Sequence, residues 1–110
     1  METSTSLQRA ERVPGSGEGI TILPLGKTYC TPGAFGAFAG ALDEVPSKYL
    51  TRHANGDWGD VDEDGRKAND HALVLGLRVL SAYTLSSGET IWILTEWDRS
   101  MTTILLPSEY

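Results

Sequence analysis

The last third of the chain alternates between apolar and polar residues with a period of two, and no other feature constrains the fold as strongly. The alternation predicts three strands, over residues 77–85, 90–97 and 101–106. The connections between them, SSGE at 86–89 and DRS at 98–100, are as short as hairpin turns require. Strands joined in this way are antiparallel neighbours. The sequence therefore predicts a three-stranded antiparallel meander at the C-terminal end.

Both faces of this meander carry large apolar side chains. Along the middle strand, Ile91, Ile93 and Trp97 lie on one face, whereas Trp92 and Leu94 lie on the other. An antiparallel sheet with one solvated face needs apolar residues on one side only. We expect helices to cover one face. The other should be covered by N-terminal extended segments, by a second copy of the chain or by a partner, because a large bare apolar patch is rare on a monomer.

Three helices are expected upstream, over about 34–42, 48–54 and 62–75. The first is preceded by Thr31, a good capping residue, and by Pro32, which suits the first helical position. Apolar spacing assigns the buried faces of the first and third helices. The residues expected on those faces are Phe35, Phe38, Leu42, Ala68, Ala72 and Leu75.

The chain has 110 residues, enough for one domain. Residues 1–19 are rich in serine, glycine and charge and hold few aliphatic side chains, so they cannot bury enough area to offset their ordering entropy. We expect a disordered tail over 1–19 and a single α+β domain over 20–110. In that domain, short extended segments at 20–23 and 27–30 precede three short helices packed on one face of the meander.

The charge balance excludes several classes of function. Fifteen acidic residues face nine basic ones, for a net charge of −6. This opposes direct binding to nucleic acid, which needs a basic surface, and docking on anionic lipid. No stretch approaches the about 18 apolar residues of a membrane span. The single cysteine, Cys30, cannot form an intrachain disulfide, which fits a reducing, cytoplasmic location.

An acidic run over 57–64 is the first candidate site. Its beginning resembles the first half of a calcium-binding loop, but the later ligand positions fall on Ala68 and His71, so we expect no metal and no cofactor. Acids are also favoured in the first turn of a helix. A metal-dependent hydrolase built on clustered carboxylates is kept as an alternative. The acidic residues of the run are Asp57, Asp60, Asp62, Glu63 and Asp64.

Residues 95–100 are the second concentration of functional groups. Asp98 can brace its own turn, and Arg99 can pair with Asp98, with Glu96 or with an acid of a partner. Nothing pairs a nucleophile with a base, so no catalytic residue is predicted. Three tryptophans suit a contact surface. The expected partner-binding residues are Asp57, Trp58, Asp60, Asp62, Glu63, Asp64, Trp92, Glu96, Trp97, Asp98 and Arg99.

Five segments, taken together, carry a resemblance to known proteins: GDWGDVDE (56–63), LRVLSAY (77–83), IWILTE (91–96), DRS (98–100) and TTILLP (102–107). They resemble a family of small bacterial proteins of unknown function that are often found on plasmids and integrative elements. The resemblance covers about residues 26–110 and implies a mobile-element setting, but no established activity.

The function expected from the sequence is that of a small acidic, non-enzymatic protein-interaction module. It would serve a mobile element as an accessory or inhibitor protein, in the manner of small anti-defence proteins. Its partner could be a basic, nucleic-acid-binding protein whose groove an acidic surface occupies. The alternatives are a hydrolase using Asp60, Asp62 and Asp64, and an antitoxin-like regulatory partner. A homodimer is also compatible with the apolar second face.

Overall fold

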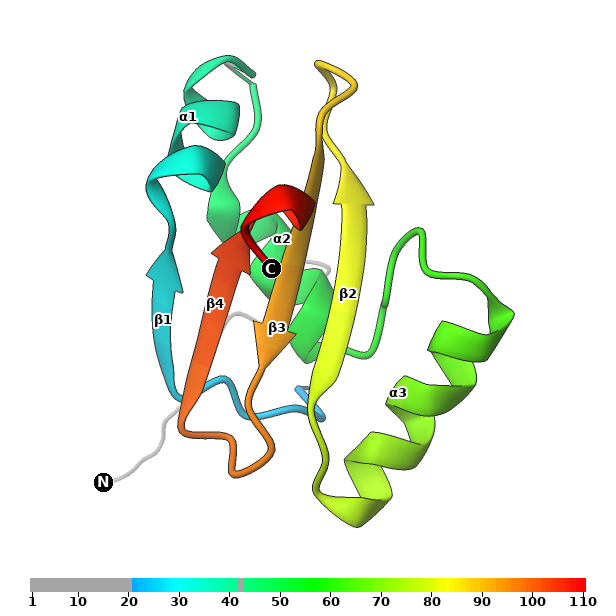
Figure 1. Cartoon of the computed structure of the whole chain (residues 1–110). Coiled ribbons are helices and arrows are strands. Elements are labelled where there is room, and N and C mark those ends of the chain that lie inside the picture. Colours follow the sequence, from blue (N-terminus) through cyan, green and yellow to red (C-terminus); the bar gives the residue numbers. More distant parts are fainter. Residues whose placement is uncertain (1–20, 42) are drawn as a thin grey trace, which may run out of the picture.

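The computed structural model describes residues 21–41 and 43–110, and the tail expected over 1–19 lies outside them (Figure 1). The chain forms an α+β domain, as predicted. Its elements are β1 (Lys27–Cys30), α1 (Pro32–Ala39), α2 (Pro46–Ala54), α3 (Glu63–Leu75), β2 (Val79–Thr84), β3 (Thr90–Thr95), β4 (Met101–Leu105) and a short 3₁₀ turn, η1 (Pro107–Glu109).

The sheet is mixed and has four strands in the order β1-β4-β3-β2. β2–β3 and β3–β4 are antiparallel, as the hairpin connections predict. The sheet is nevertheless larger than the predicted three-stranded meander and is not purely antiparallel, because β1 adds a fourth strand parallel to β4, with Lys27 opposite Met101. A four-residue strand with no alternation gives no local sign of a partner so far along the chain.

The other expected extended segment, over 20–23, forms no strand within its described residues 21–23. The backbone N–H groups of Ile22 and Leu23 both donate to the carbonyl of Ala54, at 2.8 and 3.1 Å. Leu23 is fully buried against Trp58 and Val79. This segment therefore anchors the chain at the end of α2 and does not extend the sheet.

One face of the sheet, here called the first face, forms the main core. Ile91 and Ile93 of β3 are fully buried on it, as the alternation predicts. In Figure 1, α2 lies behind the sheet on this side. The side chains of α1 and α2 close the cluster. Its buried residues are Ala34, Ala37, Phe38, Ala41, Tyr49, Tyr83, Leu85, Ile91, Ile93 and Ile104.

The predicted start of α1 is confirmed, since the Thr31 side chain accepts a hydrogen bond from the N–H of Ala34 at 3.1 Å. Its predicted buried face is wrong in part. Phe38 is buried, but Phe35 is 69% exposed and alanines take its place in the core. Leu42 lies outside the described residues. The helix is apolar on every side, so its sequence cannot indicate which side meets the sheet.

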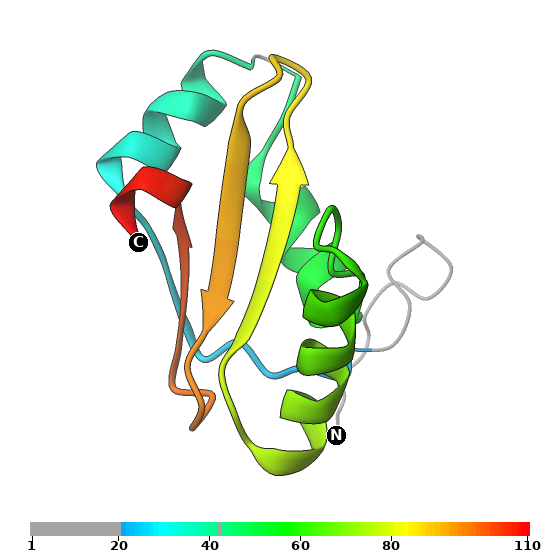
Figure 2. The ribbon, with the colours of Figure 1, turned by 45° about the vertical axis from the view of Figure 1, so that its right-hand side comes forward.

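The buried face of α3 also differs from the prediction. Ala72 is buried, but Ala68 is exposed and Leu75 is 58% exposed, whereas Asn69 is buried. The reason is the position of α3, which lies beside the edge strand β2 in both views (Figures 1 and 2). A helix at a sheet edge meets backbone hydrogen-bonding groups, and these need a polar partner.

Asn69 supplies that partner to the outer edge of β2. Its Nδ2 donates to the carbonyl oxygen of Leu80 at 2.8 Å, and its Oδ1 accepts from the Leu80 N–H at 3.1 Å. Further along the edge, Ala82 donates to the Trp58 carbonyl at 3.2 Å and accepts from the Asp60 N–H at 2.7 Å. A side-chain amide and the loop before α3 thus act as a substitute strand and close this edge.

Replacing Asn69 by aspartate tests how much the two hydrogen bonds between the Asn69 side chain and the Leu80 backbone contribute to stability. Asn69→Asp keeps the size and one acceptor, but it loses the donor and sets a carboxylate oxygen against the Leu80 carbonyl. We expect the free energy of unfolding to fall by about 1–3 kcal/mol in urea denaturation. The matched control is Asp70→Asn, whose amide oxygen can still accept from Trp58. Equal stability of Asn69→Asp and the control would contradict this role for Asn69.

Within the part of the chain that is described, no helix is long and apolar enough to cross a membrane.

Candidate functional site

The acidic run forms the loop before α3 and the first turn of that helix. Asp62 is the N-cap, and its side chain accepts from the Gly65 N–H at 2.7 Å; Glu63 and Asp64 occupy the first turn. The prediction that acids mark this helix start is confirmed. Outside the helix, Asp57 pairs with Arg52, with Oδ2 2.7 Å from Nε. This hydrogen bond holds the pKa of Asp57 below its ordinary value.

The carboxylates of the run do not converge on one point. Asp60 accepts from the Thr84 hydroxyl at 2.9 Å, Asp62 caps the helix, and Glu63 pairs with Arg66 at 3.2 Å. Over residues 21–41 and 43–110, no group of three or more His, Cys, Asp or Glu side chains is placed to hold a metal ion. The structure therefore does not assemble the carboxylate set that the hydrolase alternative requires.

Trp58 was expected on a contact surface but is only 4% exposed. Its ring meets His53 edge-on at 5.8 Å, and its Nε1 donates to Asp70 Oδ1 at 3.0 Å. The expectation fails because the indole packs with Leu23, Ala72 and Val79 in a second buried cluster. Trp58 is therefore a core residue.

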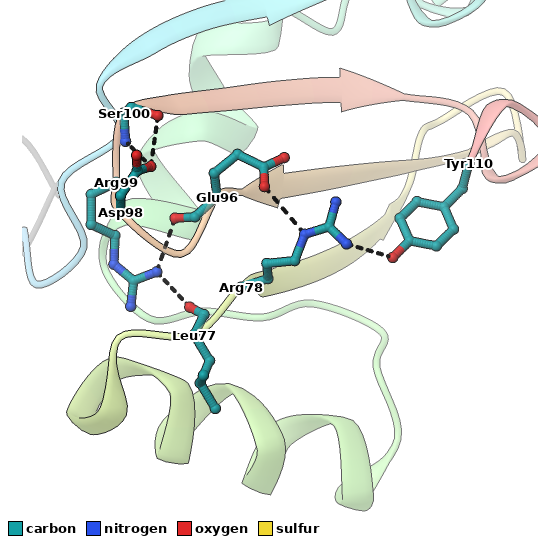
Figure 3. Close-up of polar contacts among 7 residues, drawn as sticks. All are labelled: Leu77, Arg78, Glu96, Asp98, Arg99, Ser100 and Tyr110. Carbon is teal, nitrogen blue, oxygen red and sulfur yellow. Dashed lines mark hydrogen bonds and ion pairs between the residues drawn. The ribbon is translucent and has the colours of Figure 1, made fainter.

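The β3–β4 turn is braced from within, as the sequence indicates. Asp98 Oδ1 accepts from the backbone N–H and the hydroxyl of Ser100, at 3.1 and 2.7 Å (Figure 3). Arg99 donates to the carbonyls of Ala72 at 2.9 Å and Glu96 at 3.2 Å, and also to that of Leu77. The partners of Arg99 are thus carbonyls and not the expected carboxylates. They tie the turn to the end of α3.

A row of polar and aromatic side chains crosses the other face of the sheet, here called the second face (Figure 3). Arg78 Nε lies 3.2 Å from Glu96 Oε1, and Arg78 Nη1 donates to the Tyr110 hydroxyl at 3.4 Å. The Tyr110 ring meets Trp92 edge-on, with centroids 5.5 Å apart. The row therefore links the start of β2, β3 and the residue after η1.

Beside this row lies a groove of about 550 Å³. Its floor is formed by Leu80, Ala82, Trp92 and Leu94, which pair across β2 and β3 on the second face. The loop before α3 and the helix form one side. Arg78 and Tyr110 form another. Leu80, Ala82 and Trp92 are partly exposed on this floor, whereas Leu94 is buried beneath it. None of the helical residues in the two core clusters lines the groove.

The groove gathers only part of the predicted contact set. Asp60, Asp62 and Trp92 line it, and Glu96 holds the Arg78 side chain at its border. Trp97 is 63% exposed but does not line the groove. The other predicted residues that lie outside it are Asp57, Trp58, Glu63, Asp64, Asp98 and Arg99.

Sequence reasoning missed Arg78 and Tyr110, which also line the groove. A partial signal existed for Arg78, because the period of two places it on the same face as Leu80 and Ala82. Nothing local indicates that Tyr110 folds back onto Trp92. That contact depends on η1, which Glu109 holds by accepting from the Thr31 hydroxyl and from the Leu106 N–H, at 2.5 and 2.8 Å.

A second polar assembly lies inside the first face. His53 is fully buried, with Nδ1 2.5 Å from Ser81 Oγ and Nε2 2.8 Å from Thr95 Oγ1. Thr95 Oγ1 lies 2.7 Å from Thr102 Oγ1, which donates to the Leu25 carbonyl at 2.7 Å. This chain joins α2, three strands and the segment before β1.

The chain of bonds fixes the tautomer of His53. The Leu25 carbonyl can only accept, so Thr102 donates to it and Thr95 donates to Thr102. Thr95 then accepts from Nε2–H of His53, and the Ser81 hydroxyl donates to Nδ1. Burial, together with the charge of Arg99, lowers the pKa of His53 to about 4. The assembly is neutral, satisfied and closed to solvent, so its role is structural.

No protein-family model, curated protein or solved structure matches this chain. The resemblance to the family of plasmid and integrative-element proteins therefore remains a prediction.

Proposed function

We propose that the protein is a non-enzymatic interaction module that binds a partner protein through the groove on the second face. The observation that carries the proposal is the apolar floor of this groove, which includes the partly exposed Trp92 and is lined by none of the helical residues of the core clusters. Tryptophan is enriched among the residues that dominate binding energy in protein interfaces. An exposed apolar patch of this kind usually marks a binding site.

Charge favours a basic partner. Each chain carries a net charge of −6, and Asp60 and Asp62 lie at the border of the apolar floor. Carboxylates at a rim steer a basic partner during encounter and disfavour acidic ones. A nucleic-acid-binding protein has the required basic surface. We propose a bacterial mobile element and the cytoplasm as the setting, with the protein acting there as an accessory or inhibitor.

A second copy of this chain suits the groove less well than a basic partner. A two-fold interface places the same patch on both subunits, so it would bring four groove carboxylates into one interface while each Arg78 stays paired with its own Glu96. Like charges brought together at an interface are unfavourable. We therefore expect a monomer at micromolar concentration in sedimentation velocity, and a dimer that Trp92→Ala dissociates would contradict this.

Site-specific photocrosslinking in the native host tests the proposal. A benzophenone amino acid replaces Trp92 in one variant and Phe35, which is 69% exposed on α1, in the control. We expect a discrete adduct from position 92 alone, identified by mass spectrometry. The purified partner should then bind Trp92→Ala at least tenfold more weakly than the unmodified chain. Equal crosslinking from both positions, or unchanged affinity of Trp92→Ala, would contradict a binding role for the groove.

A further inference from the structure

The groove combines an apolar floor with two carboxylates that have no cationic partner. Among the described residues, the one basic side chain that lines the groove, Arg78, is already paired with Glu96. Within the described part of the chain, the Asp60 carboxylate accepts a hydrogen bond only from the Thr84 hydroxyl, and the Asp62 carboxylate only from the Gly65 N–H. Neither takes part in an ion pair within 21–41 and 43–110. The local charge at this border is therefore negative and uncompensated.

The aromatic side chains at the groove are already arranged to receive a ligand. The Trp92 and Tyr110 rings meet at 71°, with the Arg78 guanidinium 6.0 Å from the Tyr110 ring centre. These contacts limit the freedom of Trp92 before anything binds, and this lowers the entropy lost on binding. Trp92 is half-buried, so part of its ring remains available to an incoming apolar side chain.

From these two features we infer that the groove recognises one class of ligand: a partner segment with a large apolar side chain beside a lysine or arginine. The apolar side chain packs on Trp92, Leu80 and Ala82, and the cation lies against Asp60 and Asp62. This inference rests on the proposed function and adds the chemistry of the partner. Burial on the floor supplies most of the affinity, and the carboxylates supply the preference for a cation.

Three pools of ten-residue, fluorescein-labelled peptides test the inference. Each pool has leucine at a central position and uncharged random residues elsewhere, and the residues two positions to either side are lysine, glutamine or glutamate. Binding to the full chain is measured by fluorescence polarisation. We expect the lysine pool to bind about three- to tenfold more tightly than the glutamine pool, which corresponds to two partly exposed ion pairs. The glutamate pool should bind most weakly.

Charge-matched variants separate recognition in the groove from general attraction. The double variant Asp60→Asn with Asp62→Asn keeps the acceptors for Thr84 and Gly65. It should lower the affinity for the lysine pool to that for the glutamine pool. The control, Asp43→Asn with Glu89→Gln, makes the same change in charge at two exposed acids outside the groove. This control should keep most of the preference for the lysine pool over the glutamine pool.

The outcomes also distinguish this inference from the proposed function. Equal binding of all three pools, lost in Trp92→Ala, would overturn the cation preference while leaving the groove as a binding site. A lysine preference that both double variants reduce equally would overturn the inference as well, because the attraction would then be general. A failure of every pool to bind would overturn it too. The proposed function itself fails if crosslinking at position 92 yields no specific partner, or if the purified partner binds Trp92→Ala as tightly as the unmodified chain.

Discussion

Lowering the pH from about 6.5 to 4 should remove on the order of 3 kcal/mol from the free energy of unfolding through His53 alone. The pKa of this residue falls from 6.5 to about 4 in the folded protein, because burial disfavours the imidazolium. The unfolded chain therefore takes up a proton before the folded one does. The contribution is fully present above the unfolded pKa of 6.5 and is lost as the pH falls toward 4.

Urea denaturation across this pH range, with two variants, isolates the effect. His53→Gln cannot titrate, and it should lower stability at pH 7 by about 1–3 kcal/mol because the buried hydrogen bonds of the imidazole with Ser81 and Thr95 are lost. Its stability should change much less between pH 6.5 and 4. Carboxylates such as Asp57 respond to acid in both proteins and cancel in the difference. The control is His71→Gln at the exposed histidine, and this variant should lose as much stability between pH 6.5 and 4 as the unmodified chain. If His53→Gln loses as much stability between pH 6.5 and 4 as the unmodified chain, His53 is not the source of the pH dependence.

Gly59→Ala should destabilise the protein by at least about 3 kcal/mol, with a fall of more than about 10 °C in Tm. Gly59 has a φ of +74°, and a Cβ there would lie 2.0 Å from the Ala82 carbonyl oxygen and 2.6 Å from the Tyr83 ring. The alanine must push the loop away from β2. The bonds that join Trp58 and Asp60 to Ala82 would then break.

Gly76→Ala is the matched control, because Gly76 has nearly the same φ, +71°, but nothing within 4 Å of its Cβ position. It should therefore show only the backbone cost, about 1 kcal/mol. The measurement is thermal denaturation of both variants beside the unmodified chain. If the two glycines cost the same, the close contact between the loop and β2 is not what requires Gly59.

The groove could be anticipated from the sequence only in outline. The alternation in β3 correctly separated Ile91 and Ile93 from Trp92 and Leu94 and indicated that both faces were apolar. It could not show which side of α1 or α3 meets the sheet. Asp60 and Asp62 were found as part of an acidic run, but a run cannot distinguish acids that border a groove from those that cap a helix or pair locally.

What the sequence by itself determined is local: the hairpin-linked strands β2, β3 and β4, the capped start of α1, the acidic first turn of α3, and the two-faced apolar character of the sheet. These features depend on hydrogen bonds and side-chain spacing within a few residues. Only the tertiary structure decided the parallel pairing of β1 with β4, the burial of Trp58 and the contact of Tyr110 with Trp92. Each joins residues distant in the chain, and such contacts form where the assembled fold offers unpaired backbone groups or uncovered apolar surface.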